Sequence, residues 1–311
     1  MRAVVIRAFG GTEVLEIADV AVPEVRPRQV LIRVAAATVN PVDLATRAGA
    51  LTDAGLLPAR EVIGIGWDAA RVVEATGDEV TGFRPGDRVI GMSDRLDVPL
   101  GTQADHVVLD ADALAHVPAS IGLVEAATLP LSGLTAAQAL DALALDPGRT
   151  LLVTGAAGAV GGFAVELAAA RGLRVVATAS AQDETLVRKL GAEVFVPRGA
   201  RLGEAVRQLV PGGADAAIDA AALGAEALDA VRSGGAFAAL VGGAEPRPLR
   251  GTRVFNHWIR ADGKRLAELV ALAESGTITL RVAEAMPLDR VAEAHERLAR
   301  GGLRGRLVLV P

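Results

Sequence analysis

The sequence contains no cysteine and no tyrosine, and only 3% of its 311 residues are aromatic. Without cysteine, the chain can form no disulfide, thiolate metal ligand or cysteine nucleophile, which agrees with a cytoplasmic location. Without tyrosine, any active site must work without a tyrosine acid. Every apolar run meets a charge or a turn before about 18 residues, so no membrane-spanning helix is expected. The N-terminal segment MRAVVIRAFGG also lacks the long apolar stretch of a signal peptide.

A basic surface is not expected either, because the formal net charge is −5. Nucleic acids and acidic membrane surfaces favour a basic face, so neither is an expected partner. The chain is instead 51% hydrophobic and 22% charged. This composition is typical of a globular protein, and the length is sufficient for two domains of ordinary size.

The most informative segment is residues 151–162, with the sequence LLVTGAAGAVGG. A strand-compatible run enters a glycine-rich turn, a helical stretch follows over 159–170, and the β-branched run RVVATA occupies 174–179. This order of strand, turn, helix and strand is the context that a dinucleotide-binding motif requires. The glycines are spaced G-x-x-G-x-x-G, at Gly155, Gly158 and Gly161.

Each glycine of such a turn has a physical role. One allows a sharp turn at the strand end, one lets the backbone approach a pyrophosphate, and one lets the helix pack closely on the sheet. The helix N-terminus offers N–H groups and a partial positive charge to the phosphates. A tight βα connection that binds no ligand is the alternative interpretation. The expected cofactor-binding residues of the turn are Gly155, Ala157, Gly158, Ala159 and Val160.

Strand-like and helical patterns divide the chain into three segments. Residues 1–118 carry short strand-like runs separated by glycine and proline turns, which predicts a compact β-barrel or sandwich. Residues 119–250 alternate between strands and helices, which predicts a doubly wound parallel sheet. Residues 251–311 end in the strand-like run RLVLV and are expected to complete the first domain. The predicted fold class is therefore α/β.

The middle segment has the clearest alternation of elements. Its predicted helices span 123–129, 132–143, 182–190, 202–209 and 224–231. Its predicted strands span 151–154, 174–179, 193–196, 214–218 and 235–241.

Further stretches occur in a fixed order along the chain: MRAVVIRAFGGTEVLEI, VAAATVNPVDLATRAG, GWDAARVV, FRPGDRVIG, LPLSGLTAAQAL, VTGAAGAVGG and GRLVL. Together they resemble the medium-chain dehydrogenase/reductase family, specifically its zinc-free quinone oxidoreductase branch. The resemblance covers nearly the whole chain. It implies a GroES-like catalytic domain at 1–118, a Rossmann NADP-binding domain at 119–250, and a return to the catalytic domain at 251–311.

The residues at the family's metal-binding positions argue against zinc. The zinc-dependent members use Cys, His and Glu ligands, and this chain has no cysteine. Residues 40–43, Asn-Pro-Val-Asp, stand near the position of their first Cys, and residues 66–68, Gly-Trp-Asp, stand where they have Gly-His-Glu. We therefore predict no metal. The histidines are dispersed, without ligand spacing, at His106, His116, His257 and His295.

The resemblance also implies two catalytic candidates. In zinc-free relatives the Asn of an N-x-x-D motif lies beside the nicotinamide, which corresponds to Asn40, and Asp43 is expected to orient it. The alternative is structural, because Asn-Pro is a turn former and Asp is a favoured helix cap. Relatives often have a Tyr shortly after this Asp, whereas this chain has Ala45, so a tyrosine proton donor is missing.

Three further residues are expected to contact the cofactor. Thr135 resembles a family position near the cofactor, although a threonine inside a helix can also bond to its own backbone. Val241 and Gly242 end a predicted strand on the cofactor side, where their backbone is expected to contact the nicotinamide. The alternative for this pair is a simple turn.

The choice between NADH and NADPH can be argued from charge. NAD sites place an Asp or Glu about 20 residues after the glycines, at the end of the second strand, to bind the ribose 2′-hydroxyl. Here that position holds Ala-Ser-Ala at 179–181, so no carboxylate repels a 2′-phosphate. Ser180 can donate a hydrogen bond to the phosphate and Arg198 can pair with it. Glu184, near a position where relatives often carry Lys, argues against this choice, and Arg198 as a solvated turn residue is the alternative.

We predict an NADPH-dependent, zinc-independent oxidoreductase that transfers hydride to a quinone or an α,β-unsaturated carbonyl, with the proton coming from water. The first alternative is an enoyl or 2-alkenal C=C reductase with little quinone activity. The second is a non-catalytic NADPH-binding protein, which the missing tyrosine and Arg71, at a position where relatives commonly have Gly, keep open. Relatives are often dimers that pair through the cofactor domain, so a homodimer is also expected.

Overall fold

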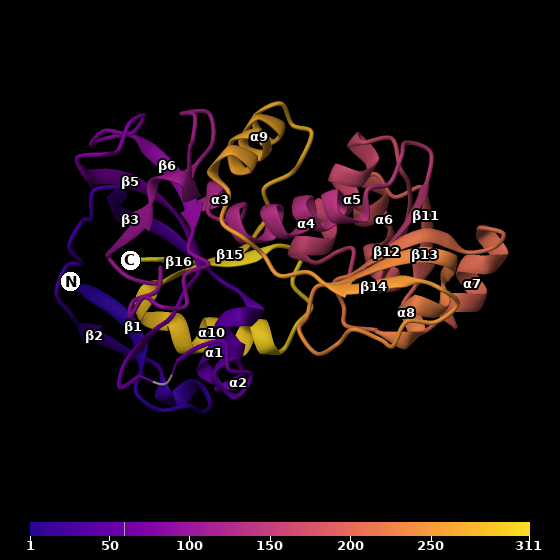
Figure 1. The fold of residues 1–311 in the computed structure, drawn as a ribbon, viewed down its shortest axis with the longest axis horizontal. Coiled ribbons are helices and arrows are strands. Elements are labelled where there is room, and N and C mark those ends of the chain that lie inside the picture. The colour runs from indigo at the N-terminus through magenta and orange to yellow at the C-terminus, as the bar shows by residue number, and fades with distance from the viewer. Residues whose placement is uncertain (59) are drawn as a thin grey trace. The chain divides into compact units, whose positions relative to one another are not determined.

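The computed structural model describes residues 1–58 and 60–311. These residues form two compact units, each assembled from segments far apart in the sequence. The first unit contains Met1–Leu131, Arg260–Ser275 and Leu280–Pro311, and the second contains Ser132–Ile259 and Gly276–Thr279. In Figure 1 the yellow elements β15, β16 and α10 lie with the indigo and violet elements of the first unit.

The first unit is organised by β3 (Gln29–Val39), a long strand whose residues are mostly buried. β3 pairs antiparallel with β5, β7 and β16, so the C-terminal strand completes a sheet formed mainly by the N-terminal part of the chain. Val30, Ile32 and Val34 alternate along β3 into one apolar cluster, as the period of a strand requires. The sheet has the order β15-β16-β3-β5-β6-β8, and a smaller sheet has the order β2-β1-β4.

The strands of this unit are β1 (Arg2–Ile6), β2 (Glu16–Asp19), β3, β4 (Ile63–Gly64), β5 (Asp68–Thr76), β6 (Arg88–Met92), β7 (His106–Asp110), β8 (Leu114–His116), β15 (Val282–Pro287) and β16 (Arg306–Val310). Its α-helices are α1 (Pro41–Arg47), α2 (Ala50–Asp53), α3 (Leu123–Ala126), α9 (Gly263–Glu274) and α10 (Val291–Ala299). Short 3₁₀ turns occupy Thr12–Val14, Ala111–Ala113 and Leu288–Arg290.

The second unit is a parallel sheet with the order β11-β10-β9-β12-β13-β14. The strand β9 (Thr150–Thr154) is buried along its whole length, because it lies inside the sheet between β10 and β12. Leu152 and Phe237 from two of these strands lie in one apolar core cluster with Val206 of α7 and Leu228 of α8. The predicted doubly wound parallel sheet is confirmed.

The other strands of this unit are β10 (Arg174–Ala179), β11 (Val194–Pro197), β12 (Ala214–Asp219), β13 (Val231–Ala239) and β14 (Arg253–Asn256). Its helices are α4 (Pro130–Leu143, in this unit from Ser132), α5 (Ala159–Ala170), α6 (Glu184–Lys189), α7 (Leu202–Leu209), α8 (Ala225–Asp229) and the 3₁₀ turn Ala181–Asp183.

The compact units differ from the predicted segments at two boundaries. Residues 119–131, expected to open the nucleotide-binding domain at 119–250, belong to the first unit, because α3 packs against β3 and β5. Residues 251–259, expected to begin the return at 251–311, stay in the second unit, because β14 extends its sheet by pairing in parallel with β13.

Three predicted helices also differ from the structure. The predicted helix 123–129 is shorter in the structure, where α3 ends at Ala126, and the predicted helix 132–143 begins earlier, at Pro130, because proline has no backbone N–H to continue a helix and instead begins a new one. The predicted helix 224–231 ends at Asp229, and Val231 already begins β13, which ends at Ala239 rather than at 241. A bulge in the pairing of β12 with β13 accommodates the extra residues of this early start.

Within the part of the chain that the structure describes, no helix is both long and apolar enough to span a membrane.

Candidate active site: a glycine turn and a buried polar cluster

The glycine-rich turn of the second unit has the geometry of a phosphate-binding loop. β9 ends at Thr154, Gly155 turns the chain with φ of +61°, and α5 begins at Ala159. A Cβ atom on Gly161 would lie 2.2 Å from the carbonyl oxygen of Gly155, so this close approach of helix and turn requires glycine. Gly158 and Ala159 are half-buried and leave part of the helix N-terminus open to a ligand.

The turn lies where the strand order reverses. From β9 the chain proceeds to β10 and β11 on one side, and then returns to β12 and β13 on the other side of β9. In open parallel sheets, ligands bind beyond the carboxyl ends of the strands at such a switch point. A diphosphate at this position would meet the positive end of α5, a helix of 12 residues. The turn therefore fits the dinucleotide that the sequence predicts.

Ser180 and Arg198 lie next to each other in the sheet, because each follows the end of one of two paired strands. Ala179 of β10 pairs with Pro197 of β11, and the N–H of Arg198 donates to the carbonyl of Ala179 at 2.7 Å. Ser180 is half-buried and Arg198 is exposed. The carboxylate of Glu184, which argued against a phosphate here, accepts from the Nε of Arg188 at 2.8 Å. Its charge is therefore offset locally.

The remaining predicted cofactor residues differ in their surroundings. Val241 and Gly242 are exposed and follow the carboxyl end of β13, at the same edge of the sheet as the glycine turn. Thr135 is buried inside α4, with 8% of its surface exposed. The parallel sheet thus brings the glycine turn, Ser180, Arg198 and the 241–242 segment to one edge.

Asn40 and Asp43 lie in the first unit, in a buried polar cluster after the end of β3. Both residues are fully buried. The side-chain amide of Asn40 donates to Asp68 Oδ1 at 2.8 Å and to Thr38 Oγ1 at 3.0 Å. The backbone N–H of Asn40 donates to Asp43 Oδ2 at 2.7 Å, so Asp43 supports the start of α1 from its third helical position. Asp43 therefore caps the helix, which is the structural role that the sequence analysis gave as the alternative to a role in the active site.

The other members of this cluster were not identified from sequence. Thr38 Oγ1 donates to Asp68 Oδ1 at 2.5 Å, and the amide of Gln103 donates to the carbonyl of Thr38 at 3.1 Å and to Asp43 Oδ2 at 3.4 Å. Thr38 and Asn40 are two residues apart at the end of a strand, a spacing that places side chains on one face. This spacing was the available local signal, whereas Asp68 reaches the cluster through the pairing of β3 with β5 and Gln103 reaches it from the segment before β7.

The cluster is electrostatically unusual because its carboxylates are buried. Burial raises the pKa of Asp43 to about 8, against the backbone hydrogen bond that it accepts from Asn40. Burial also raises the pKa of Asp68, against its hydrogen bonds from Thr38 and Leu131. Among the described residues, Asn40 Oδ1, Asp43 Oδ1 and Gln103 Oε1 are buried oxygens that have no hydrogen-bond donor. The cluster can therefore accept further hydrogen bonds.

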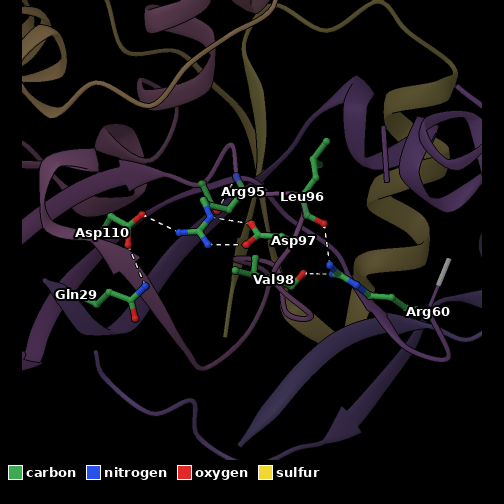
Figure 2. A network of polar contacts seen from close by, with 8 residues as sticks. Gln29, Arg60, Arg95, Leu96, Asp97, Val98 and Asp110 are labelled. Carbon is green, nitrogen blue, oxygen red and sulfur yellow. Dashed lines mark hydrogen bonds and ion pairs between the residues drawn. The ribbon is translucent and has the colours of Figure 1, made fainter. Parts of the chain in front are cut away.

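Two cavities of the first unit lie elsewhere. One, of about 380 Å³, includes Arg95 and Asp110 in its lining. Figure 2 shows the polar network around Arg95, which pairs with Asp97 at 2.6 Å and with Asp110 at 3.2 Å. The other, of about 500 Å³, includes Phe83 and Asp110 in its lining. Neither lining includes Asn40 or Asp43.

The fold and the glycine turn define a class of protein: an α/β enzyme with a dinucleotide-binding sheet and a separate β-rich unit. Comparison with known proteins agrees with this class. The chain matches the family model of the alcohol dehydrogenase GroES-like domain over residues 26–119. It matches that of the zinc-binding dehydrogenases over residues 190–309.

Human quinone oxidoreductase is 31% identical, with 100% of this chain and 98% of the human protein covered. The chloroplastic NADPH-dependent alkenal/one oxidoreductase of Arabidopsis thaliana is 32% identical, with 100% and 80% covered. The crystal structure of an NAD-dependent alcohol dehydrogenase is similar with a TM-score of 0.89, at 32% identity and with 100% of both chains covered. The chain belongs to the medium-chain dehydrogenase/reductase family, in its zinc-free quinone oxidoreductase branch, and it is an oxidoreductase.

This membership confirms the predicted fold class, with a GroES-like unit and a Rossmann unit. One matching model is named for zinc-binding dehydrogenases, but this chain contains no cysteine. Over residues 1–58 and 60–311, no group of three or more His, Asp or Glu side chains could hold a metal ion. His106 pairs with Glu74 at 3.0 Å, and His116 donates to the carbonyl of Gly82 at 2.9 Å.

Proposed function

We propose that this oxidoreductase uses NADPH to reduce a quinone or an α,β-unsaturated carbonyl without zinc. The observation that carries the proposal is the glycine turn at the switch point of the sheet, with Ser180 and Arg198 at the end of the neighbouring strands. The names of the human and Arabidopsis relatives support the substrate classes, and the Arabidopsis name supports NADPH. When bound, the nicotinamide supplies the hydride.

The chain's own residues have distinct parts in this proposal. The backbone of Gly155, Ala157, Gly158, Ala159 and Val160 binds the diphosphate. Ser180 and Arg198 bind the 2′-phosphate, a charge-assisted contact that NADH cannot make. Thr135, Val241 and Gly242 contribute to the nicotinamide end of the site.

Asn40 and Asp43 are proposed as positioning residues. Both N–H groups of the Asn40 amide are committed to Thr38 and Asp68, so its oxygen is the available atom. An amide oxygen accepts hydrogen bonds, and it therefore suits a hydrogen-bond donor better than a substrate carbonyl. Asp43 holds the backbone of Asn40 in place. No tyrosine is available as the acid, so water supplies the proton.

The proposal is tested by following NADPH oxidation at 340 nm with a panel of quinones, enones, 2-alkenals and enoyl thioesters. Turnover of quinones and enones is expected. Turnover restricted to 2-alkenals or enoyl thioesters would replace the proposal by the alternative C=C reductase. NADPH binding without turnover of any acceptor would indicate a binding protein and would refute the reductase.

Cofactor choice is tested separately by titrating NADPH and NADH against wild type, Ser180→Asp and Arg198→Ala. Arg198→Ala removes one charge-assisted contact to the 2′-phosphate, so it should weaken NADPH binding by about tenfold or more and leave NADH binding unchanged. Ser180→Asp adds a carboxylate that repels the phosphate, so it should reverse or flatten the preference for NADPH. Arg201→Ala is the matched control, because Arg201 is exposed nearby and pairs with Glu204. Equal affinities of wild type for both cofactors would contradict the proposed phosphate pocket.

A further inference from the structure

A second polar pair lies at the switch point of the sheet, beside the glycine turn. Thr154 ends β9 and Asp219 ends β12, and the two residues are direct partners across these strands. Both are fully buried. Thr154 Oγ1 donates to Asp219 Oδ1 at 2.5 Å. The sequence analysis assigned no role to either residue.

The pair holds the loop that follows β12. Asp219 accepts from the backbone N–H of Leu223 at 3.1 Å and from that of Gly224 at 2.8 Å. Thr154 Oγ1 accepts from the backbone N–H of Ala221 at 3.0 Å. Asp219 thus has hydrogen bonds on both carboxylate oxygens, and three backbone donors of one short loop are tied to two side chains in the sheet.

The loop is strained, exposed and close to the turn. Ala222 has φ of +54°, a left-handed conformation that alanine rarely adopts. Ala221 and Ala222 are exposed. A Cβ atom on Gly155 would lie 3.3 Å from the carbonyl carbon of Ala220, so the start of the loop lies against the turn. Backbone strain that is held by surrounding hydrogen bonds concentrates at functional sites.

We propose that Asp219 and Thr154 are positioning residues that hold the backbone of residues 220–222 as a second wall of the dinucleotide site. The wall faces the ribose–pyrophosphate part of the ligand, since it lies beside the glycine turn at the carboxyl edge of the sheet. This inference rests on the proposed function. It assigns to the loop after β12 a binding role that its sequence, DAAALG, does not indicate by any glycine or phosphate motif.

The test measures NADPH affinity and steady-state kinetics for Asp219→Asn. An amide nitrogen cannot accept from a backbone N–H, so one loop donor loses its partner. We expect the Kd and the KM for NADPH to rise about tenfold, the effect of one lost hydrogen bond to a charged acceptor, with little change in kcat. Thr154→Val should have a similar effect, and Thr154→Ser, which keeps the hydroxyl, should restore affinity.

Asp215→Asn is the matched control, because Asp215 lies near the opposite end of the same strand. Its carboxylate also accepts from a backbone N–H, that of Thr150 at 2.8 Å, and from Arg232 at 2.8 Å. We expect this variant to lose stability without losing NADPH affinity. Hydrogen exchange gives a local readout, since the amides of Leu223 and Gly224 should lose protection in Asp219→Asn and keep it in Asp215→Asn.

The outcomes separate the inference from the proposed function. If wild type binds NADPH and Asp219→Asn binds it equally well, the wall is refuted and the reductase stands. An equal loss of affinity in Asp215→Asn would show a general structural effect and would also refute the wall. If wild type binds neither NADPH nor NADH, both proposals fail together.

Discussion

Replacing Arg71 by methionine should stabilise the first unit. Arg71 lies on β5 with 0% of its surface exposed, and its guanidinium nitrogens have no hydrogen-bond partner in the part of the chain that the structure describes. Its neighbours across the sheet are Val34 of β3 and Val89 of β6, both members of the apolar cluster of this unit. A buried charge without a partner destabilises the folded state, because it loses its hydration on folding.

The pKa of Arg71 gives the sign and an upper limit. Burial lowers this pKa to about 9, well below the ordinary value of an arginine, and the nearby Asp68 offsets the effect only in part. A base whose pKa falls on folding destabilises the protein at every pH below that lowered value, so the full effect is present at pH 7. At 1.36 kcal/mol per pKa unit, the shift corresponds to about 5 kcal/mol. Apolar replacements of buried ionic groups gain about 1–4 kcal/mol, so Arg71→Met should raise the unfolding free energy by about 2 kcal/mol.

Urea unfolding followed by tryptophan fluorescence can measure this effect in the first unit alone. The chain has two tryptophans, the buried Trp67 in the first unit and the more exposed Trp258 in the second. In a Trp258→Phe background, Trp67 alone reports on the first unit. Arg33→Met, at an exposed arginine on the adjacent β3, is the control and should change little. A lower midpoint for Arg71→Met at constant m-value would refute the reasoning, because it would mean that the guanidinium has a stabilising partner in solution.

Three further predictions concern the glycine turn and the buried polar cluster. Gly161→Ala should cost about 2 kcal/mol and abolish NADPH binding, because its Cβ would meet the Gly155 carbonyl at 2.2 Å. Gly148→Ala is the control: Gly148 has φ of +82° but no close neighbours, so this variant should lose stability and keep NADPH binding. Thermal unfolding and cofactor titration measure both effects, and NADPH binding that survives in Gly161→Ala but is lost in Gly148→Ala would contradict the prediction. The pKa of the Asp43 carboxyl is about 8 in the folded protein and 3.8 when the carboxyl is unperturbed, so the unfolded state ionises first as the pH rises. The unfolding free energy of wild type should therefore decline between about pH 4 and 8, and Asp43→Asn should flatten this decline. Parallel urea midpoints of wild type and variant across this range would contradict the burial of Asp43. Thr38→Val should cost about 1–3 kcal/mol by removing a donor from buried Asp68, and Thr38→Ser should not; equal midpoints in urea for these two variants would count against the cluster.

The second unit could be predicted from sequence because its signals are local. The strand, turn and helix of 150–170 are contiguous, and the glycine spacing reflects close backbone contacts that form within about ten residues of the chain. The position of Arg198 beside Ser180 also followed, since consecutive parallel strands of this topology lie next to each other. The boundary errors have a local cause as well. Neither Pro130 as a helix start nor the bulge that lets β13 begin at Val231 can be recognised from periodicity.

The two buried clusters could not be predicted in the same way. Thr154 and Asp219 are 65 residues apart, and they meet only because β12 inserts beside β9. Asn40 and Asp68 meet only because β3 and β5 pair antiparallel, and Gln103 enters from the segment before β7. The family resemblance therefore pointed to Asn40 and Asp43 as a pair but gave no indication of the donors and acceptors that restrict what Asn40 can do.

The hydrogen bonds of Asp68 explain how this unit manages without a zinc ligand set. Asp68 stands at the position of the family's zinc-site glutamate, and a buried carboxylate needs donors or a cation to balance it. Thr38 and Asn40 donate to its Oδ1, and the backbone N–H of Leu131 donates to its Oδ2 at 3.0 Å. A cation at this carboxylate would have to displace these donors and leave the Asn40 amide without a partner. Asn40, in the segment that stands near the first cysteine of the zinc enzymes, thus balances the buried carboxylate of Asp68 as a hydrogen-bond donor.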